Sequence, residues 1–133
     1  LWKLFSKASQ GSSYTNVSYV NTYTTSGIIY ASMTGSDFKQ TNLSTVANSY
    51  SKSITQDDEH EMFKKVEYTS INGKRYAYFT YTTSKADYKS YGTVYMTCDN
   101  GTAHIFTLIQ NEVFYGSAEI DDFIDIVNSF QSK

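Results

Sequence analysis

The sequence predicts an α+β fold with a single antiparallel β-sheet of about six strands, built from hairpins and flanked by two α-helices. Two dipeptides predict the sheet, since Asn72-Gly73 and Asn100-Gly101 each stand between segments of alternating polarity. Asn-Gly is the strongest short-range signal for a two-residue hairpin turn, because both residues tolerate the positive φ angles that the turn requires. Two stretches in which apolar residues recur with helical spacing predict the helices.

The two turns define hairpins over Lys64–Tyr81 and Thr93–Gln110. A two-residue turn fixes the strand register, and the register decides which side chains share a face. The predicted pairs are Tyr68 with Ala77 and Val66 with Phe79 in the first hairpin, and Cys98 with Ala103, Met96 with Ile105 and Val94 with Thr107 in the second. The segment between the hairpins, Ser84 to Ser90, is predicted to be a charged loop.

The N-terminal third is predicted to add one more hairpin. Val17–Tyr23 and Ile28–Met33 alternate as strands do, and the turn between them contains Gly27. Residues 1–16 begin with an apolar cluster and then become rich in Ser, Gln and Gly. We expect a short strand or helical turn that packs its aromatic side chains on the domain, followed by a loop. The alternative is the end of a linker to a membrane anchor.

Both predicted helices have a residue suited to the N-cap. Asn42 precedes a stripe of apolar residues that repeats over Leu43–Ile54, and Ser117 precedes a second stripe that ends at Phe130. The second helix also carries Glu119 in its first turn, where the positive end of the helix dipole favours an acid. The predicted order is therefore β-β-α-β-β-β-β-α.

Length and composition indicate one domain over residues 1–133, in which residues 1–16 are a linker or an N-terminal extension. A chain of 133 residues can bury a core without disulfides or metals. Its net charge is −2, with no basic cluster that would favour nucleic acid and no apolar stretch long enough to cross a bilayer. A polar, Tyr-rich surface and a single cysteine are typical of an exported bacterial domain, so we expect a cell-surface location, with membrane contact only through an anchor outside this chain.

The pattern also resembles the PsbP-like family, the fold shared by the photosystem-associated protein, the Ran-binding Mog protein and many small exported bacterial lipoproteins. The resembling parts are the helix over 42–54, Gly73–Phe79, Ala103–Leu108 and the ending Asp121–Phe130, with its Ser-Phe pair. The resemblance covers roughly residues 17–131. It implies a PsbP-like sandwich and a non-enzymatic binding or assembly module, and it carries over no catalytic residue.

An aromatic sheet face is the first candidate binding surface. Its residues are Tyr76, Tyr78, Tyr95 and Phe106, with His104 beside them. The face can stack sugars or hold a protein partner, and the alternative is a second core layer covered by a helix. The second candidate is the loop between the hairpins, with Asp87, Tyr88, Lys89 and Tyr91, because loops on a rigid sheet often carry recognition.

Two other clusters are interpreted as structural. The run Asp57–Glu61 lacks the ligand spacing of a calcium loop and a second histidine for zinc, so we expect a solvated connector. Cys98 and His104 suggest a nucleophile and a base, but the register directs them to opposite faces. No catalytic residue, metal site or cofactor is therefore predicted.

The leading functional hypothesis is a non-catalytic binding or assembly domain outside the cytoplasm, acting on an unknown protein or cell-wall component. The alternative is a small-ligand carrier with a cavity lined by Tyr78, Tyr95 and Phe106. An enzyme is the third class, and it would need two titratable groups that converge in one cleft.

Overall fold

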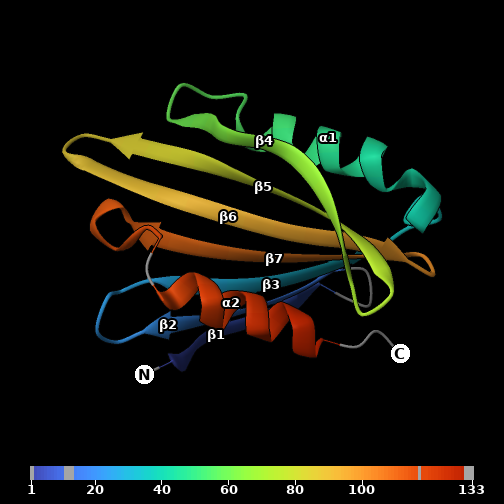
Figure 1. Cartoon of the computed structure of the whole chain (residues 1–133), viewed down its shortest axis with the longest axis horizontal. Coiled ribbons are helices and arrows are strands. Elements are labelled where there is room, and N and C mark those ends of the chain that lie inside the picture. Colours follow the sequence, from blue (N-terminus) through green and yellow to red (C-terminus); the bar gives the residue numbers. More distant parts are fainter. Residues whose placement is uncertain (1, 11–13, 117, 131–133) are drawn as a thin grey trace.

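The computed structural model describes the backbone of residues 2–10, 14–116 and 118–130, and the side chains of most of them. These residues form a seven-stranded antiparallel sheet in the order β1-β2-β3-β7-β6-β5-β4 (Figure 1). The elements are β1 (Trp2–Gln10), β2 (Tyr14–Asn21), β3 (Gly27–Thr34), α1 (Leu43–Ile54), β4 (His60–Ile71), β5 (Lys74–Lys85), β6 (Tyr88–Asp99), β7 (Thr102–Asn111) and α2 (Ala118–Ser129), with short 3-10 helices η1 (Gln40–Asn42) and η2 (Glu112–Phe114).

The predicted fold, a six-stranded sheet flanked by two α-helices in a PsbP-like sandwich, is wrong. The two helices are present, but the described chain is more dominated by sheet and has seven strands. The additional strand is β1, which pairs along β2 from Trp2 opposite Asn21 to Gln10 opposite Tyr14. Its polar second half, Ser6–Gln10, carries little strand signal of its own. Pairing with β2 satisfies the backbone hydrogen bonds of this segment, and this pairing cannot be predicted from the strand propensity of the segment itself.

The predicted loop at Ser84–Ser90 is also wrong. β5 and β6 continue to Lys85 and Tyr88, so only Ala86 and Asp87 lie between them. Ala86 adopts a φ of 54°, a left-handed conformation that favours Gly or Asn. Alanine rarely adopts it, so the sequence did not indicate a tight turn here. The second half of the chain is therefore one continuous meander of four strands rather than two hairpins joined by a loop.

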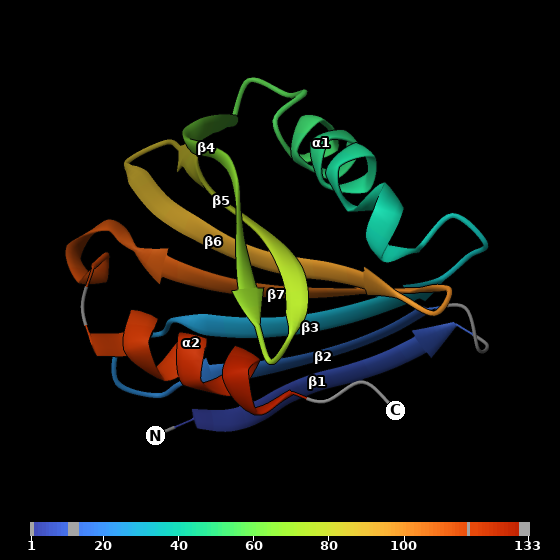
Figure 2. The ribbon, with the colours of Figure 1, turned by 45° about the vertical axis from the view of Figure 1, so that its right-hand side comes forward.

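Both Asn-Gly turns form as predicted, with positive φ at Asn72, Gly73, Asn100 and Gly101. The second hairpin has the predicted register throughout, including Cys98 opposite Ala103. The first has it from the turn to Glu67, which pairs with Tyr78. Beyond that point the register of β4 shifts, so the predicted pair of Val66 with Phe79 does not form, and β4 bends strongly across β5 (Figure 2).

The two helices cover opposite faces of the sheet, because they contact different sets of strand side chains. α1 packs on the face that carries Ala77, Phe79, Val94, Met96 and Ile105. α2 packs on the other face, whose residues are Ile28, Tyr76, Phe106 and Leu108. The sheet therefore separates two apolar layers. One lies between the sheet and α1, and the other lies between the sheet and α2 (Figure 2).

Candidate functional site

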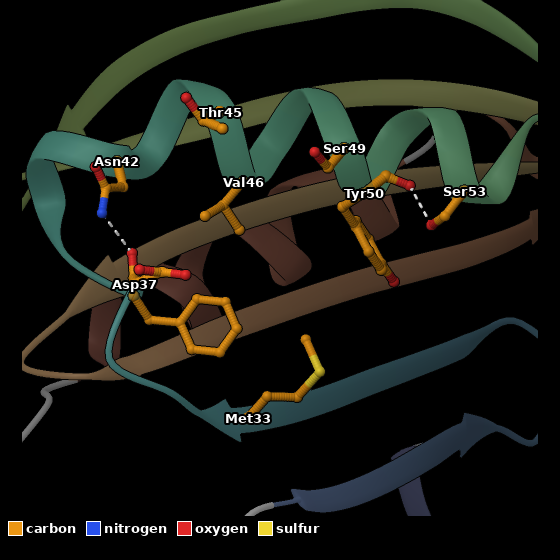
Figure 3. A pocket seen from close by; sticks show the side chains of 9 residues that line it. Met33, Asp37, Asn42, Thr45, Val46, Ser49, Tyr50 and Ser53 are labelled. Carbon is orange, nitrogen blue, oxygen red and sulfur yellow. Dashed lines mark hydrogen bonds between the residues drawn. The ribbon is translucent and has the colours of Figure 1, made fainter.

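An open groove with a volume of about 610 Å³ lies between α1 and β3 (Figure 3). Three elements line it. β3 contributes Met33, and the segment between β3 and α1 contributes Asp37, Phe38 and, at the end of η1, Asn42. One side of α1 contributes the remaining residues, which are Thr45, Val46, Ser49, Tyr50 and Ser53. The groove runs along the side of α1 that faces β3.

The segment that carries Phe38 is tied to the β6–β7 turn. The N–H of Gly35 donates to the carbonyl of Gly101 at 2.9 Å, and the N–H of Gly101 donates to the carbonyl of Phe38 at 2.9 Å. A Cβ at position 35 would lie 3.1 Å from the Phe38 ring, so glycine lets the ring pack closely over its own loop. These contacts hold Phe38 at the end of the groove.

The groove combines an apolar floor with a polar rim. Met33, Phe38, Val46 and Tyr50 are half-buried and pack on the core under α1. The rim carries exposed hydroxyl groups of α1 and a single carboxylate, Asp37. Such a mixture binds an apolar group and fixes its orientation through a few polar contacts.

The polar side chains at the rim differ in whether they already make a hydrogen bond. Ser53 Oγ donates to the carbonyl of Tyr50 at 2.7 Å, and Asn42 Nδ2 donates to the carbonyl of Asp37 at 2.8 Å. The side-chain hydroxyls of Thr45 and Ser49, in contrast, make no hydrogen bond to the described residues, so both are available to a ligand. This site was not predicted from the sequence, because its lining comes from β3, from the segment after it and from α1, and only the fold brings these together. The one signal was the wide spread of small hydroxyl residues along a helix that they do not favour.

The predicted aromatic face is largely covered. Tyr76 and Phe106 are buried, and Tyr95 makes an edge contact with Phe123 of α2, with ring centroids 6.0 Å apart. Tyr78 lies at the margin, where its ring stacks on that of Tyr95 at 5.1 Å and its hydroxyl donates to Glu67 Oε2 at 3.2 Å. This is the second core layer that the sequence analysis weighed as the alternative. Tyr78 and Phe106 line separate cavities rather than one.

The residues of the predicted recognition loop lie on strands and a tight turn. Asp87 is in the turn, and Tyr88, at the start of β6, is half-exposed. Tyr91 is buried, and its ring stacks on that of Tyr115 at 4.1 Å while Phe63 contacts both rings edge-on. The structure therefore divides the predicted surface into an exposed turn and a ring cluster in which Tyr91 is buried and Phe63 is 49% exposed.

The acidic run forms a turn before β4. Asp57 Oδ1 accepts hydrogen bonds from the N–H groups of Glu59 and His60 and lies 2.7 Å from His60 Nδ1. The hydrogen bond from His60 lowers the pKa of the Asp57 carboxyl below its usual value. Among the described residues, no three His, Cys, Asp or Glu side chains are grouped so that they could hold a metal ion.

Cys98 and His104 lie on opposite faces, as predicted. Cys98 belongs to the layer under α1, where burial raises the pKa of its thiol to about 11 and so makes it a poor nucleophile at neutral pH. His104 lies on the other face, where its Nδ1 is 2.8 Å from the Tyr30 hydroxyl and its ring contacts Phe130. Its Nε2 is buried without a hydrogen-bond partner among the described residues.

Acid should destabilise the fold through His104. Burial, assisted by the charge of Lys74 and opposed by that of Asp99, lowers the pKa of this histidine in the folded state. The unfolded chain then binds the proton more readily, so the contribution to stability is complete above the ordinary pKa of about 6.5 and declines as the pH falls below it. Urea unfolding at pH 7.5 and pH 5.5 should show this loss, at most about 1.4 kcal/mol per pH unit from this group. His104→Gln should reduce the loss, and an unchanged pH dependence in that variant would contradict the assignment.

The comparisons with known proteins do not identify a class for this protein. A scan against protein-family models finds no match, and a search of curated proteins finds none either. Within the described residues, no helix is long and apolar enough to cross a membrane. The fold and the groove thus define the chain only as an α+β domain with an open groove beside α1.

Proposed function

We propose that this chain is a non-catalytic binding and assembly module that takes an apolar group of a protein partner into the groove between α1 and β3. The observation that carries the proposal is the groove itself, with its apolar floor beneath hydroxyl groups that are free to bind (Figure 3). Its volume of about 610 Å³ is within the range of roughly 300–1,000 Å³ that is usual for binding pockets.

The character of the lining favours binding over catalysis. Acid–base chemistry needs two titratable groups with matched pKa values in one cleft. In the groove, Asp37 is the one lining residue that is charged at neutral pH, and it is exposed. A lone exposed carboxylate with no histidine, lysine or second carboxylate beside it in the groove serves recognition better than proton transfer.

The location of the module is part of the proposal. A surface rich in Ser, Thr, Asn and Tyr with one buried cysteine supports a role outside the cytoplasm, on a bacterial surface and through an anchor beyond this chain. The partner is then an envelope protein, and a cell-wall glycan is the other outcome of the test below. The PsbP-like resemblance stays a prediction that no match tests.

Site-specific photocrosslinking tests the groove. p-Benzoylphenylalanine at Ser49, an exposed groove residue, should give a covalent product in an envelope extract of the bacterium that produces the protein. The matched control is Asn48, which is exposed on the same helix but does not line the groove. Mass spectrometry of the product identifies whether peptide or glycan is attached.

The expected result is a peptide adduct from Ser49 alone. Equal products from Ser49 and Asn48 would mean that contact is not specific to the groove, and no adduct from Ser49 would contradict the proposal. Val46→Trp, which fills the groove from its half-buried wall, should reduce the adduct at least tenfold while circular dichroism stays unchanged.

A further inference from the structure

A second cavity lies on the opposite face of the sheet. Its volume is about 340 Å³, and it is lined by residues of β2, β3, β7 and α2, which are Tyr19, Ile28, Tyr30, Phe106 and Ile126. Ile28 and Phe106 belong to the layer under α2, on the other side of the sheet from Met33 and the groove. The two cavities therefore share no lining residue and can be tested independently.

The cavity arises at the side of α2. The helix turns Glu119, Phe123 and Val127 toward the sheet, and these three residues are its buried positions. Ile126 is at the flank of this stripe and is 40% exposed. The sheet continues beyond the helix to β2 and β1, where Tyr19 is 42% exposed and its cross-strand neighbour Leu4 is 59% exposed. The result is a pit with a buried floor and an exposed apolar rim.

The floor is well packed and apolar. Ile28 and Phe106 are 4% and 3% exposed. Tyr30 tilts over Phe106 with ring centroids 5.0 Å apart, and its hydroxyl is occupied by His104 Nδ1 at 2.8 Å. That leaves the Tyr19 hydroxyl as the remaining polar side-chain group of the lining. An occupant must therefore gain its affinity from apolar and ring contacts.

Charge further restricts the occupant. No lining residue is charged, so the cavity cannot compensate a buried ion, whose desolvation is costly. On α2, Asp122 and Asp125 are exposed, four residues and one residue before Ile126. Residues four apart lie on the same side of a helix, so Asp122 is next to the mouth of the cavity. This placement opposes anions in particular.

We propose that this cavity is a binding site for a small uncharged apolar molecule of about one or two rings. Its volume is at the low end of roughly 300–1,000 Å³ for ligand pockets, and three of the five lining residues are aromatic. Stacked or edge-on contacts with these rings reward a flat ligand over a flexible chain. The site gives the domain a small-molecule function that does not depend on a partner in the α1 groove.

Indole is the probe for the test, and indole-3-acetate is its anionic counterpart. Titration followed by ¹H–¹⁵N correlation spectra should show shifts at residues of β2, β3, β7 and α2, with affinity for indole at least tenfold above that for indole-3-acetate. Ile126→Trp fills the cavity from an exposed position and should lower indole affinity at least tenfold. Val46→Trp, which fills the groove on the other face, is the matched control and should leave indole affinity unchanged.

Each other outcome would overturn the proposal. Absence of indole binding to the unmodified chain would exclude the site, and shifts confined to α1 and β3 would assign the ligand to the groove instead. Equal affinity for the two probes would refute the role of Asp122 and the uncharged lining. Should Ile126→Trp lose its native spectrum, Ile126→Glu supplies the same test by placing a carboxylate on the rim, and unchanged indole affinity there would count against the site.

Discussion

Replacing Phe123 with alanine is expected to lower the free energy of unfolding by about 3–5 kcal/mol. Phe123 is fully buried in the layer between α2 and the sheet, and it makes the edge contact with Tyr95. Truncation removes its apolar surface from the layer and leaves a cavity that rigid strands cannot fill by moving. Urea unfolding followed by circular dichroism measures the change.

The matched control is Val113→Ala. Val113 is 80% exposed, so its truncation should alter the free energy of unfolding by no more than about 0.5 kcal/mol. A loss below 1 kcal/mol for Phe123→Ala would mean that α2 does not seat this ring on the sheet. The aromatic face would then be the exposed surface that its sequence first suggested.

The Asn-Gly turns were predictable because each carries its own local cause. A positive φ at two successive residues needs Asn and Gly, and the two-residue loop then fixes the register by geometry alone. This reasoning placed Cys98 and His104 on opposite faces and excluded them as a catalytic pair. It failed at Val66, where β4 shifts register over Lys64–Glu67 without a glycine to mark it.

The elements that could not be predicted depend on distant partners. β1 is a strand because β2 pairs with it, and Ala86 turns the chain because two long strands on either side hold it there. The aromatic face shows the same limit. Alternation placed Tyr76, Tyr95 and Phe106 on one side of the sheet, but only the position of α2 decides that they form a core layer rather than a binding surface.

The groove was hidden for a related reason. The stripe that packs α1 on the sheet is visible in its sequence, since Leu43 and Ala47 recur with helical spacing. On the side that lines the groove, hydroxyl residues stand beside Val46 and Tyr50. The groove forms only because Met33 and Phe38, which precede the helix in the chain, lie opposite this side. A groove needs two facing surfaces, and the helical periodicity of α1 describes only one of them.

Glu119 is the residue whose role differs most from its sequence interpretation, and its replacement by alanine should lower the free energy of unfolding by about 2–4 kcal/mol. The sequence suggests only an acid that favours the start of α2. In the structure its carboxylate is buried and accepts hydrogen bonds from Thr24 Oγ1 at 2.5 Å, Ser26 Oγ at 2.8 Å and Gln110 Nε2 at 3.1 Å. It thereby joins α2 to the β2–β3 turn and to the end of β7.

Alanine at position 119 removes the acceptor that these three donors share, and two of them, Ser26 and Gln110, are buried. The β2–β3 turn is therefore expected to lose protection first. Hydrogen exchange should therefore accelerate at residues of the β2–β3 turn, in addition to the shift in urea unfolding. Glu119→Gln keeps one acceptor oxygen and should cost about half as much, since hydrogen bonds to a charged group are stronger than neutral ones. Asp121→Ala is the control, because Asp121 is an exposed acid of the same first turn and its loss removes only a favourable dipole interaction of about 0.3–1 kcal/mol. Equal losses for Glu119→Ala and Asp121→Ala would reduce Glu119 to a dipole effect and remove the buried network as the link between α2 and the sheet.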